Sequence, residues 1–315
     1  MSDVKEKVLL VGDNPFHGIS HLSQERSRSR GFDLTLAEQA ANLVMISHRN
    51  GADGFMFSVS DLTLSILRKI SEYGGNVSLD LYPIVPYMYE YVRMANRLGG
   101  IPGLAKKFAR ELIMSGNLKS VAYGLDAAAR ADPTSLTKAY LAYEISRTKS
   151  SAGKQASLRS MLIHQAITDM ALALDMDWFF EVCIDFLSNQ RIIPGFNTGN
   201  LVYLANKFKA WGLGLERILI AAPFNKTGFQ MNPSRTECEK ILSSSKSSMV
   251  IAVSIFAAGY LNPSEAIDYI ATLPHLKGVA VGVSKEKQAR ETFKLLQGGL
   301  GLEPSGLCCP AGTRA

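Results

Sequence analysis

The stretches Ile218–Ala222 (ILIAA), Val250–Ser254 (VIAVS) and Val279–Val283 (VAVGV) are short apolar runs, and an amphipathic segment of helical period separates each from the next. Short runs rich in valine, isoleucine and leucine are typical of parallel strands that are buried on both faces. The same alternation extends back to the start of the chain. The five earlier runs are Val8–Val11, Gly54–Ser58, Val77–Leu81, Ser160–Ile163 and Ile192–Phe196.

The eight strand-and-helix units predict the fold class. Strands that alternate with helices form a parallel sheet, and eight units in 315 residues predict an α/β fold, the (β/α)8 TIM barrel. We expect one barrel domain over residues 1–315. In such a barrel the chemistry takes place at the carboxyl ends of the strands, where each following loop begins.

The third unit is longer than the others. About eighty residues separate Leu81 from Ser160, whereas a loop and a helix usually take a few tens. The sequence therefore predicts a helical insertion after the third strand, at about residues 99–157. Such an insertion forms either a wall over the site or a contact between subunits, so the sequence leaves a homo-oligomer open. The helices predicted after this strand are Tyr82–Leu98, Leu104–Ser115 and Thr134–Lys149.

The composition argues against several classes of protein. The net charge of +6 is modest and dispersed, which favours a small anionic substrate over a nucleic acid. The longest apolar stretch, Met249–Leu261, is too short to span a membrane, and Met1–Lys7 lacks the apolar core of a secretion signal. The four cysteines form no CxxC pair, which argues for reduced thiols and against a thiolate zinc site. We therefore expect a cytoplasmic protein with no membrane partner.

Polar side chains occur where nearly every predicted strand ends. Taken singly, each could also be a turn former, a loop residue or a packed core residue, so the prediction of a site rests on their joint placement. Four have the chemistry of acid–base or Schiff-base catalysis, namely Asp13, Asp80, His164 and Lys226. The candidates for substrate binding at the same ends are Asn14, His17, Ser58, Tyr82, Gln165, Asn197, Asn225 and Ser254.

The loops after the last two predicted strands carry small residues and positive charge. Gly259 follows the seventh strand, and Gly282 and Ser284 end the eighth, directly before a helix. Small residues let backbone N–H groups approach an anion, and a helix N-terminus favours negative charge. We therefore predict a phosphate-binding site formed by Gly259, Gly282, Ser284 and Lys285.

The later part of the chain resembles the aldo-keto reductase superfamily. The matching stretches are Gly195–Thr198 (GFNT), Ser254–Leu261 (SIFAAGYL) and Gly282–Leu296 (GVSKEKQARETFKLL), and His164 is similar to the histidine that follows the family's fourth strand. The resemblance implies a TIM barrel and an oxidoreductase that uses NADP. It also implies an aspartate and a tyrosine after the second strand and a lysine at the end of the third. Here Phe57–Asp61 is followed by no close tyrosine, and Val77–Leu81 contains no lysine.

Three kinds of function are compatible with these residues. The departure from the reductase pattern favours an aldolase-like lyase or an isomerase that acts on a small phosphorylated carbonyl compound without a cofactor, with Asp13 or Asp80 as the base and Lys226 as a Schiff-base former. The first alternative is a metal-dependent hydrolase or lyase. The second is a reductase-like oxidoreductase that uses NADP, or a binding protein without catalysis. The ligands of a divalent metal would be His17, His21, Asp80 and His164.

Overall fold

The computed structural model of the chain describes residues 7–17, 34–73, 78–87, 96–97, 99, 107, 132–154, 156–244 and 248–302. Nine β-strands occur in these residues, and all of their pairings are parallel. The strands are β1 (Val8–Gly12), β2 (Gly54–Ser58), β3 (Leu79–Val85), β4 (Ala156–Leu158), β5 (Ser160–Ile163), β6 (Ile193–Asn197), β7 (Leu219–Pro223), β8 (Met249–Val253) and β9 (Leu276–Gly282).

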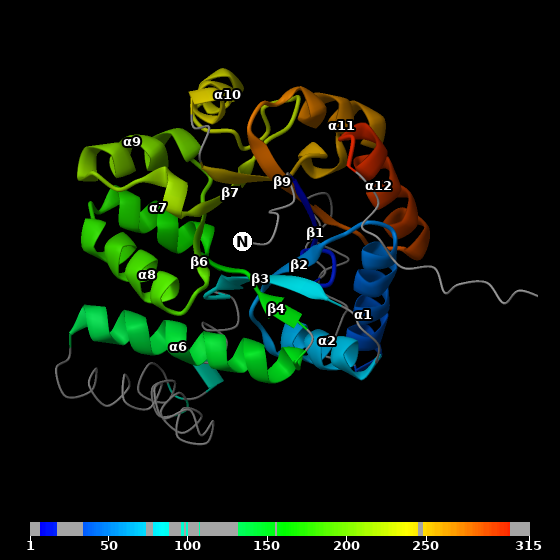
Figure 1. Ribbon diagram of the computed structural model, residues 1–315, viewed down its shortest axis with the longest axis horizontal. Helices are drawn as coiled ribbons and strands as arrows, with labels where there is room; N and C mark the ends of the chain where they lie inside the picture. Colours follow the sequence, from blue (N-terminus) through cyan, green and yellow to red (C-terminus); the bar gives the residue numbers. More distant parts are fainter. Residues whose placement is uncertain are drawn as a thin grey trace, which may run out of the picture.

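Eight of these strands close into a barrel. The order β2-β1-β9-β8-β7-β6-β5-β3 runs around the ring, and a further pairing of β2 with β3 joins its two ends. The remaining strand, β4, pairs with β3 and is separated from β5 only by Arg159, so it extends β5 and adds no new unit. The predicted (β/α)8 TIM barrel is therefore confirmed (Figure 1).

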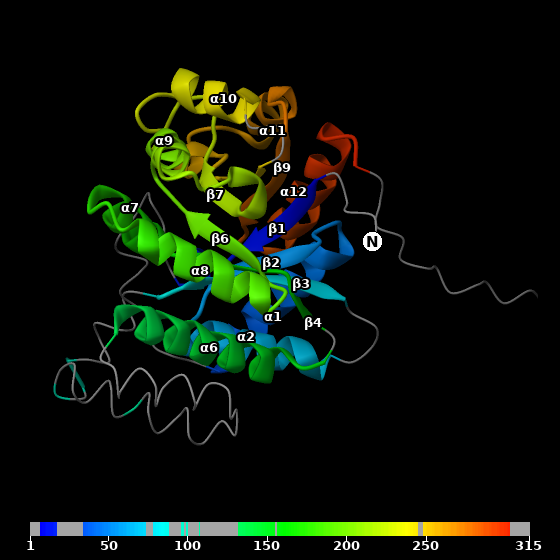
Figure 2. The same ribbon diagram turned by 60° about the vertical axis from the view of Figure 1, so that its left-hand side comes forward.

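Helices surround the barrel on its outer side (Figure 1, Figure 2). No helix within the described residues is long and apolar enough to cross a membrane. The α-helices are α1 (Leu34–Arg49), α2 (Asp61–Glu72), α6 (Pro133–Ala152), α7 (Gln165–Ala173), α8 (Asp177–Asn189), α9 (Leu201–Trp211), α10 (Arg235–Ser244), α11 (Pro263–Thr272) and α12 (Glu286–Gly299), and the short 3-10 helices are η2 (Leu215–Arg217) and η3 (Ala257–Gly259).

Capping side chains determine where several helices begin. Ser60 caps α2, because its Oγ accepts a hydrogen bond from the Thr63 N–H at 3.1 Å while Thr63 Oγ1 accepts one from the Ser60 N–H at 2.9 Å. Asp132 and Asn262 each stand directly before a proline and accept hydrogen bonds from N–H groups in the first turns of α6 and α11. These side chains fix where the three helices begin.

The hydrophobic core has two parts. Leu10, Met56 and Leu162 belong to the smaller part, which fills the barrel interior. The larger part lies between the strands and the helices. It includes the ring of Phe180, whose centroid is 5.1 Å from that of Phe196 on β6. Burial of these side chains on both faces of the strands explains why the strands are mostly apolar.

The third strand lies further along the chain than predicted. The apolar run predicted a strand over Val77–Leu81 and a helix from Tyr82, but β3 covers Leu79–Val85. Pro83 lies inside β3, opposite Phe57 of β2. Proline has no N–H to donate within a sheet and is rare there, so its presence indicated a turn. The end of the strand moves from Leu81 to Val85, which is roughly 13 Å of extended chain.

The predicted insertion falls largely outside the described residues. Of the predicted helix over Leu104–Ser115, the structure describes residue 107 alone. The predicted helix over Thr134–Lys149 is confirmed as α6. It packs against α2 and α8 on the outside of the barrel. The full extent of the insertion stays a prediction.

Candidate functional site

A cavity of about 910 Å³ opens at the end of the barrel where the carboxyl ends of the strands meet, which we call the mouth. All eight barrel strands contribute to its wall, directly or through the residue that follows them. Its floor is apolar, because Met56, Ile84 and Ala280 of the barrel interior line it. The predicted site residues at this cavity are Asp13, Asn14, Ser58, His164, Gln165, Asn197, Ser254, Gly259, Gly282, Ser284 and Lys285.

Asp13 is the buried carboxylate of the mouth. It follows β1 and is 4% exposed. Its Oδ2 accepts a hydrogen bond of 2.6 Å from the Ser58 N–H at the end of β2 and lies 3.1 Å from His17 Nε2. The His17 ring packs against Tyr87, with ring centroids 4.8 Å apart. Asp13 is among the residues that line the cavity, whereas His17 is not, and its imidazole lies behind the carboxylate within the distance needed to exchange a proton.

His164 is held in one tautomer. It stands between β5 and α7 as the N-cap of the helix, and its Nδ1 accepts a hydrogen bond from the Ala166 N–H at 3.2 Å. A neutral imidazole that accepts at Nδ1 carries its proton on Nε2. Burial lowers the pKa of His164 below its ordinary value, although the charges of Asp13 and Asp169 partly offset this effect. At neutral pH the ring is therefore a neutral N–H donor in the cavity wall.

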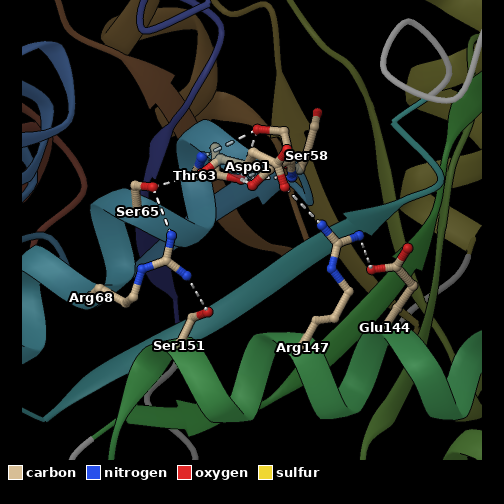
Figure 3. Close-up of polar contacts among 9 residues, drawn as sticks. Ser58, Asp61, Thr63, Ser65, Arg68, Glu144, Arg147 and Ser151 are labelled. Carbon is tan, nitrogen blue, oxygen red and sulfur yellow. Dashed lines mark hydrogen bonds and ion pairs between the residues drawn. The ribbon is translucent and has the colours of Figure 1, made fainter. Parts of the chain in front are cut away.

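Ser58 is held from the outer side by the start of α2. Its carbonyl oxygen accepts a hydrogen bond from Thr63 Oγ1 at 2.7 Å. The next layer out is α6, where Arg147 Nη2 lies 3.3 Å from Asp61 Oδ1 and its other terminal nitrogen lies 3.6 Å from the buried Glu144 carboxylate. Figure 3 shows both contacts: the one with Asp61 joins α6 to α2, and the one with Glu144 lies within α6. Ser58, whose N–H donates to Asp13, is thus connected through α2 to the polar contact with α6.

The loop after β6 is held by a carboxylate that the sequence reasoning did not single out. Asp169 of α7 accepts hydrogen bonds from Thr198 Oγ1 at 2.6 Å and from the Gly199 N–H at 3.1 Å. These two residues follow Asn197, which lines the cavity. The available signal was weak, since Asp169 lies within an apparent helix rather than at a strand end.

The loop after β8 has an unusual backbone. Ser254, Ala257 and Ala258 have φ values of 55°, 46° and 59°. Non-glycine residues in this left-handed region cost of order 1 kcal/mol or more each, and such strain is concentrated at binding sites. Ser254 and Ala258 both line the cavity. The strained segment therefore belongs to the wall of the mouth.

The end of β9 packs directly on the first loop. A Cβ atom on Gly282 would lie 2.7 Å from the ring carbons of Pro15, too close for any ordinary contact. Glycine here therefore allows the Pro15 turn, which carries Asp13, to approach β9. The helix that follows, α12, has Lys285 as its N-cap, without a side-chain cap, while Gln288 Oε1 accepts a hydrogen bond from the Ser284 N–H at 3.0 Å.

Two predicted residues of the third strand lie away from the mouth. Asp80 is paired in register with Gly54, the first residue of β2, so it lies at the amino end of the barrel. Its Oδ2 is 2.9 Å from Arg159 Nε, and burial raises its pKa. Tyr82 is buried in the barrel interior, where burial raises the phenol pKa, and it is not among the cavity-lining residues described. The physical reason is the later end of β3.

Lys226 and Asn225 also lie outside the cavity. The Lys226 ammonium is half exposed and pairs with Glu265 at 2.6 Å, in a separate groove beside α10 and α11. A solvated, paired lysine has no desolvation to activate it as a Schiff-base former. Asn225 is fully buried, and its amide donates to the carbonyl oxygens of Phe229 at 2.8 Å and Ser254 at 3.3 Å. It joins the loops that follow β7 and β8.

The structure does not assemble the alternative metal site. His17 and His164 lie near Asp13, but Asp80 is at the opposite end of the barrel, and His21 lies outside the described residues. In the described part of the chain, no group of three or more histidine, cysteine, aspartate or glutamate side chains could hold a metal ion.

Comparison with known proteins supports the fold. No protein-family model matches the chain, and no match among curated proteins was found. Two solved structures from Pseudomonas aeruginosa, each named as a "putative aldo-keto reductase", are similar to it. The first is 10% identical, with 95% of this chain and 99% of the other covered and a TM-score of 0.53. The second is also 10% identical, with 93% and 90% covered and a TM-score of 0.52.

The predicted lyase or isomerase is wrong. At 10% identity these structures establish a shared fold, and the resemblance predicted from the later stretches is confirmed at that level. Both structures are named as putative aldo-keto reductases, and neither is named as a lyase or an isomerase. The catalytic scheme also used Asp13 or Asp80 as the base and Lys226 as a Schiff-base former, and Asp80 and Lys226 both lie away from the mouth.

Proposed function

We propose that the chain is an oxidoreductase that reduces a small carbonyl compound with a nicotinamide dinucleotide, NADPH or NADH. The observation that carries this proposal is the neutral His164, whose Nδ1 is occupied as an acceptor and whose Nε2–H is left as a donor beside the Asp13–His17 pair. A neutral donor and a separate acid–base pair are what a carbonyl oxygen needs as it becomes an alcohol. The reductase-like barrel supports the same reading.

The residues around the mouth fit a dinucleotide. Lys285 and Lys287 place two positive charges in the cavity wall, and α12 begins at its edge without a side-chain cap. Free N–H groups and the dipole of a helix N-terminus favour a phosphate there. These residues, together with the strained loop at Ser254–Gly259, would hold the dinucleotide. When bound, its nicotinamide ring supplies a hydride to the carbonyl carbon.

The chain's own residues then act on the carbonyl oxygen. His164 Nε2–H donates a hydrogen bond to it and stabilises the negative charge that develops. A proton held at His17 Nε2 passes through the Asp13 carboxyl to the same oxygen, and solvent restores the proton on His17. The apolar floor of Met56, Ile84 and Ala280 accommodates the rest of a small substrate and excludes water. This arrangement uses a histidine–aspartate pair where the resembling reductases are expected to use tyrosine and lysine.

A titration and an assay test this function. Purified protein is titrated with NADPH and with NADH by fluorescence, and a panel of small aldehydes and keto acids is then assayed for loss of the nicotinamide absorbance. We expect saturable binding of at least one dinucleotide, weakened about tenfold or more in the double variant Lys285→Ala, Lys287→Ala. Lys294→Ala is the matched control, because Lys294 is exposed on the same helix but is not part of the cavity wall. Absence of binding by both dinucleotides would contradict the proposal.

A further inference from the structure

Asp169 joins two parts of the mouth that are far apart in the chain. It lies on α7, the helix that His164 caps, and both of its carboxylate oxygens accept hydrogen bonds from the loop after β6. Thr198 Oγ1 donates at 2.6 Å, and Thr198 is fully buried. Hydrogen bonds to an ionised carboxylate are shorter and about twice as strong as neutral ones. This contact is therefore a rigid connection between the strand-five and strand-six walls.

The same loop is fixed on two further sides. The Gly199 carbonyl oxygen accepts a hydrogen bond from Asn232 Nδ2 at 3.0 Å. A Cβ on Gly199 would lie 2.3 Å from Gln165 Nε2, so the amide of Gln165 packs directly on this glycine. Gln165 and Asn197 both line the cavity. The loop can thus shift only if the cavity wall shifts with it.

We propose that Asp169 is a positioning residue of the mouth, which holds His164 and Asn197 in a fixed relation over the substrate through its bonds to Thr198 and Gly199. The kinetic consequence of this inference rests on the proposed reductase function. The position of the His164 ring in the cavity wall can be tested without assuming that function.

The electrostatics of His164 provide a readout of this role. Burial lowers the pKa of His164, while two carboxylates act in the opposite direction: Asp13 from β1 and Asp169 from its own helix. His17 also belongs to this group, since its Nε2 lies 3.1 Å from Asp13. A negative charge near an imidazole favours the protonated ring. Removing the charge of Asp169 must therefore lower the pKa of His164 further.

The first experiment measures the titration of His164 by NMR of the intact protein. The His164 resonance is assigned from its loss in His164→Gln, and its titration is compared between the wild type and Asp169→Asn. We expect a lower His164 pKa in Asp169→Asn. The control is Asp185→Asn, since Asp185 is an exposed carboxylate on α8 that lies 3.9 Å from Arg217. An unchanged His164 titration in Asp169→Asn would overturn the inference, whatever the protein's activity.

The second experiment separates positioning from mere folding. Thr198→Val removes the buried donor to Asp169 but keeps the carboxylate, and Thr198→Ser restores the hydroxyl. We expect kcat to fall about tenfold in Thr198→Val, with the KM for the dinucleotide little changed, and to return towards the wild-type value in Thr198→Ser. Equal kcat in all three proteins would overturn the kinetic part of the inference. If no reductase activity is found, the NMR chemical shift of the His164 ring is compared in the same three proteins. Thr198→Val keeps the Asp169 charge, so a shift that changes there and returns in Thr198→Ser reports position alone. An unchanged shift would overturn the positioning role, so the two failures are distinguishable.

Discussion

The fold places the Asp13 and Asp80 carboxylates at opposite ends of the barrel, and the sequence predicted either of them as the catalytic base. Asp13 lies in the cavity wall at 3.1 Å from His17, whereas Asp80 lies at the amino end of the barrel beside Arg159. We expect Asp13→Asn to lower kcat by about a hundredfold or more, the usual contribution of a positioned proton-transfer group. Asp80→Asn should leave kcat within about twofold of the wild type, because it is remote from the reacting atoms.

These two variants are read together in steady-state assays, with circular dichroism as the check on folding. A loss of turnover in Asp80→Asn equal to that in Asp13→Asn would mean that the chemistry does not take place at the mouth. Retained turnover in Asp13→Asn would remove the proton-transfer role of the Asp13–His17 pair.

Gly282 offers a second test at the scale of one atom. A methyl group there would meet the Pro15 ring at 2.7 Å, so Gly282→Ala has to displace the turn that carries Asp13. We expect a loss of about 1–3 kcal/mol in the free energy of unfolding, typical of overpacking, together with reduced kcat. Gly298→Ala is the matched control, because nothing lies within 4 Å of the added atom and the position is helical. It should be neutral or stabilising by about 0.5 kcal/mol. Urea denaturation of both variants measures the difference.

At the scale of elements, the contact between α2 and α6 contains two arginines in different surroundings. Arg147 is 14% exposed in its side chain and pairs with Glu144, which is fully buried. Arg68 donates to hydroxyl groups, of Ser151 at 3.3 Å and Ser65 at 2.8 Å (Figure 3). Both side chains connect the same helices, but only Arg147 balances a buried charge in these contacts.

Substitution by methionine distinguishes the two arginines. Arg147→Met should lower the free energy of unfolding by about 3 kcal/mol, because it removes a cation from a buried carboxylate. Arg68→Met should cost no more than about 1 kcal/mol, since it removes bonds to neutral hydroxyls. The double variant Arg147→Met, Glu144→Leu should recover most of the loss. Chemical denaturation measures the free energy of unfolding of each variant. Equal stability of Arg147→Met and Arg68→Met would contradict the prediction.

The strands could be predicted wherever a strand of the barrel coincides with a short apolar run in the sequence. Seven of the eight apolar runs coincide with barrel strands to within a few residues, because strands buried on both faces have few polar positions to interrupt the apolar run. The predicted bounds of the third strand were wrong because Pro83, a residue type that indicates a turn, lies within β3. That error alone misplaced Asp80 and Tyr82, since depth in a barrel depends on where the strand ends.

The candidate site could be predicted only as a set of strand ends. Asp13, Ser58 and His164 directly follow or end a strand, so their position at the mouth follows from the topology. Lys226 is three residues past β7, and it pairs with Glu265 in a separate groove, while its neighbour Asn225 is buried. Asp169 depends on a hydrogen bond to a loop thirty residues later, and no local pattern reports such a contact.

For the whole molecule, charge gives the next prediction. The chain carries a net charge of +6 and places Lys285 and Lys287 in the cavity wall. Attraction between these lysines and a polyphosphate is screened by salt. We expect the Kd for NADPH to rise on the order of tenfold between about 0.05 M and 0.5 M salt. The variant Lys285→Ala, Lys287→Ala should show a flatter dependence. A salt-independent Kd in the wild type would show that the lysines do not contact the phosphates.

The position of β1 in the ring has a consequence for how the protein is made. Val8 of β1 lies beside Gly278 of β9, so β1 is paired on one side by a strand that is synthesised 270 residues later. Until that partner is synthesised, β1 exposes an unpaired edge, and such edges invite pairing with other chains. Contacts this distant in sequence also form slowly. The ring therefore stays open until β9 has been synthesised, and chaperone capture during translation is expected to protect that edge.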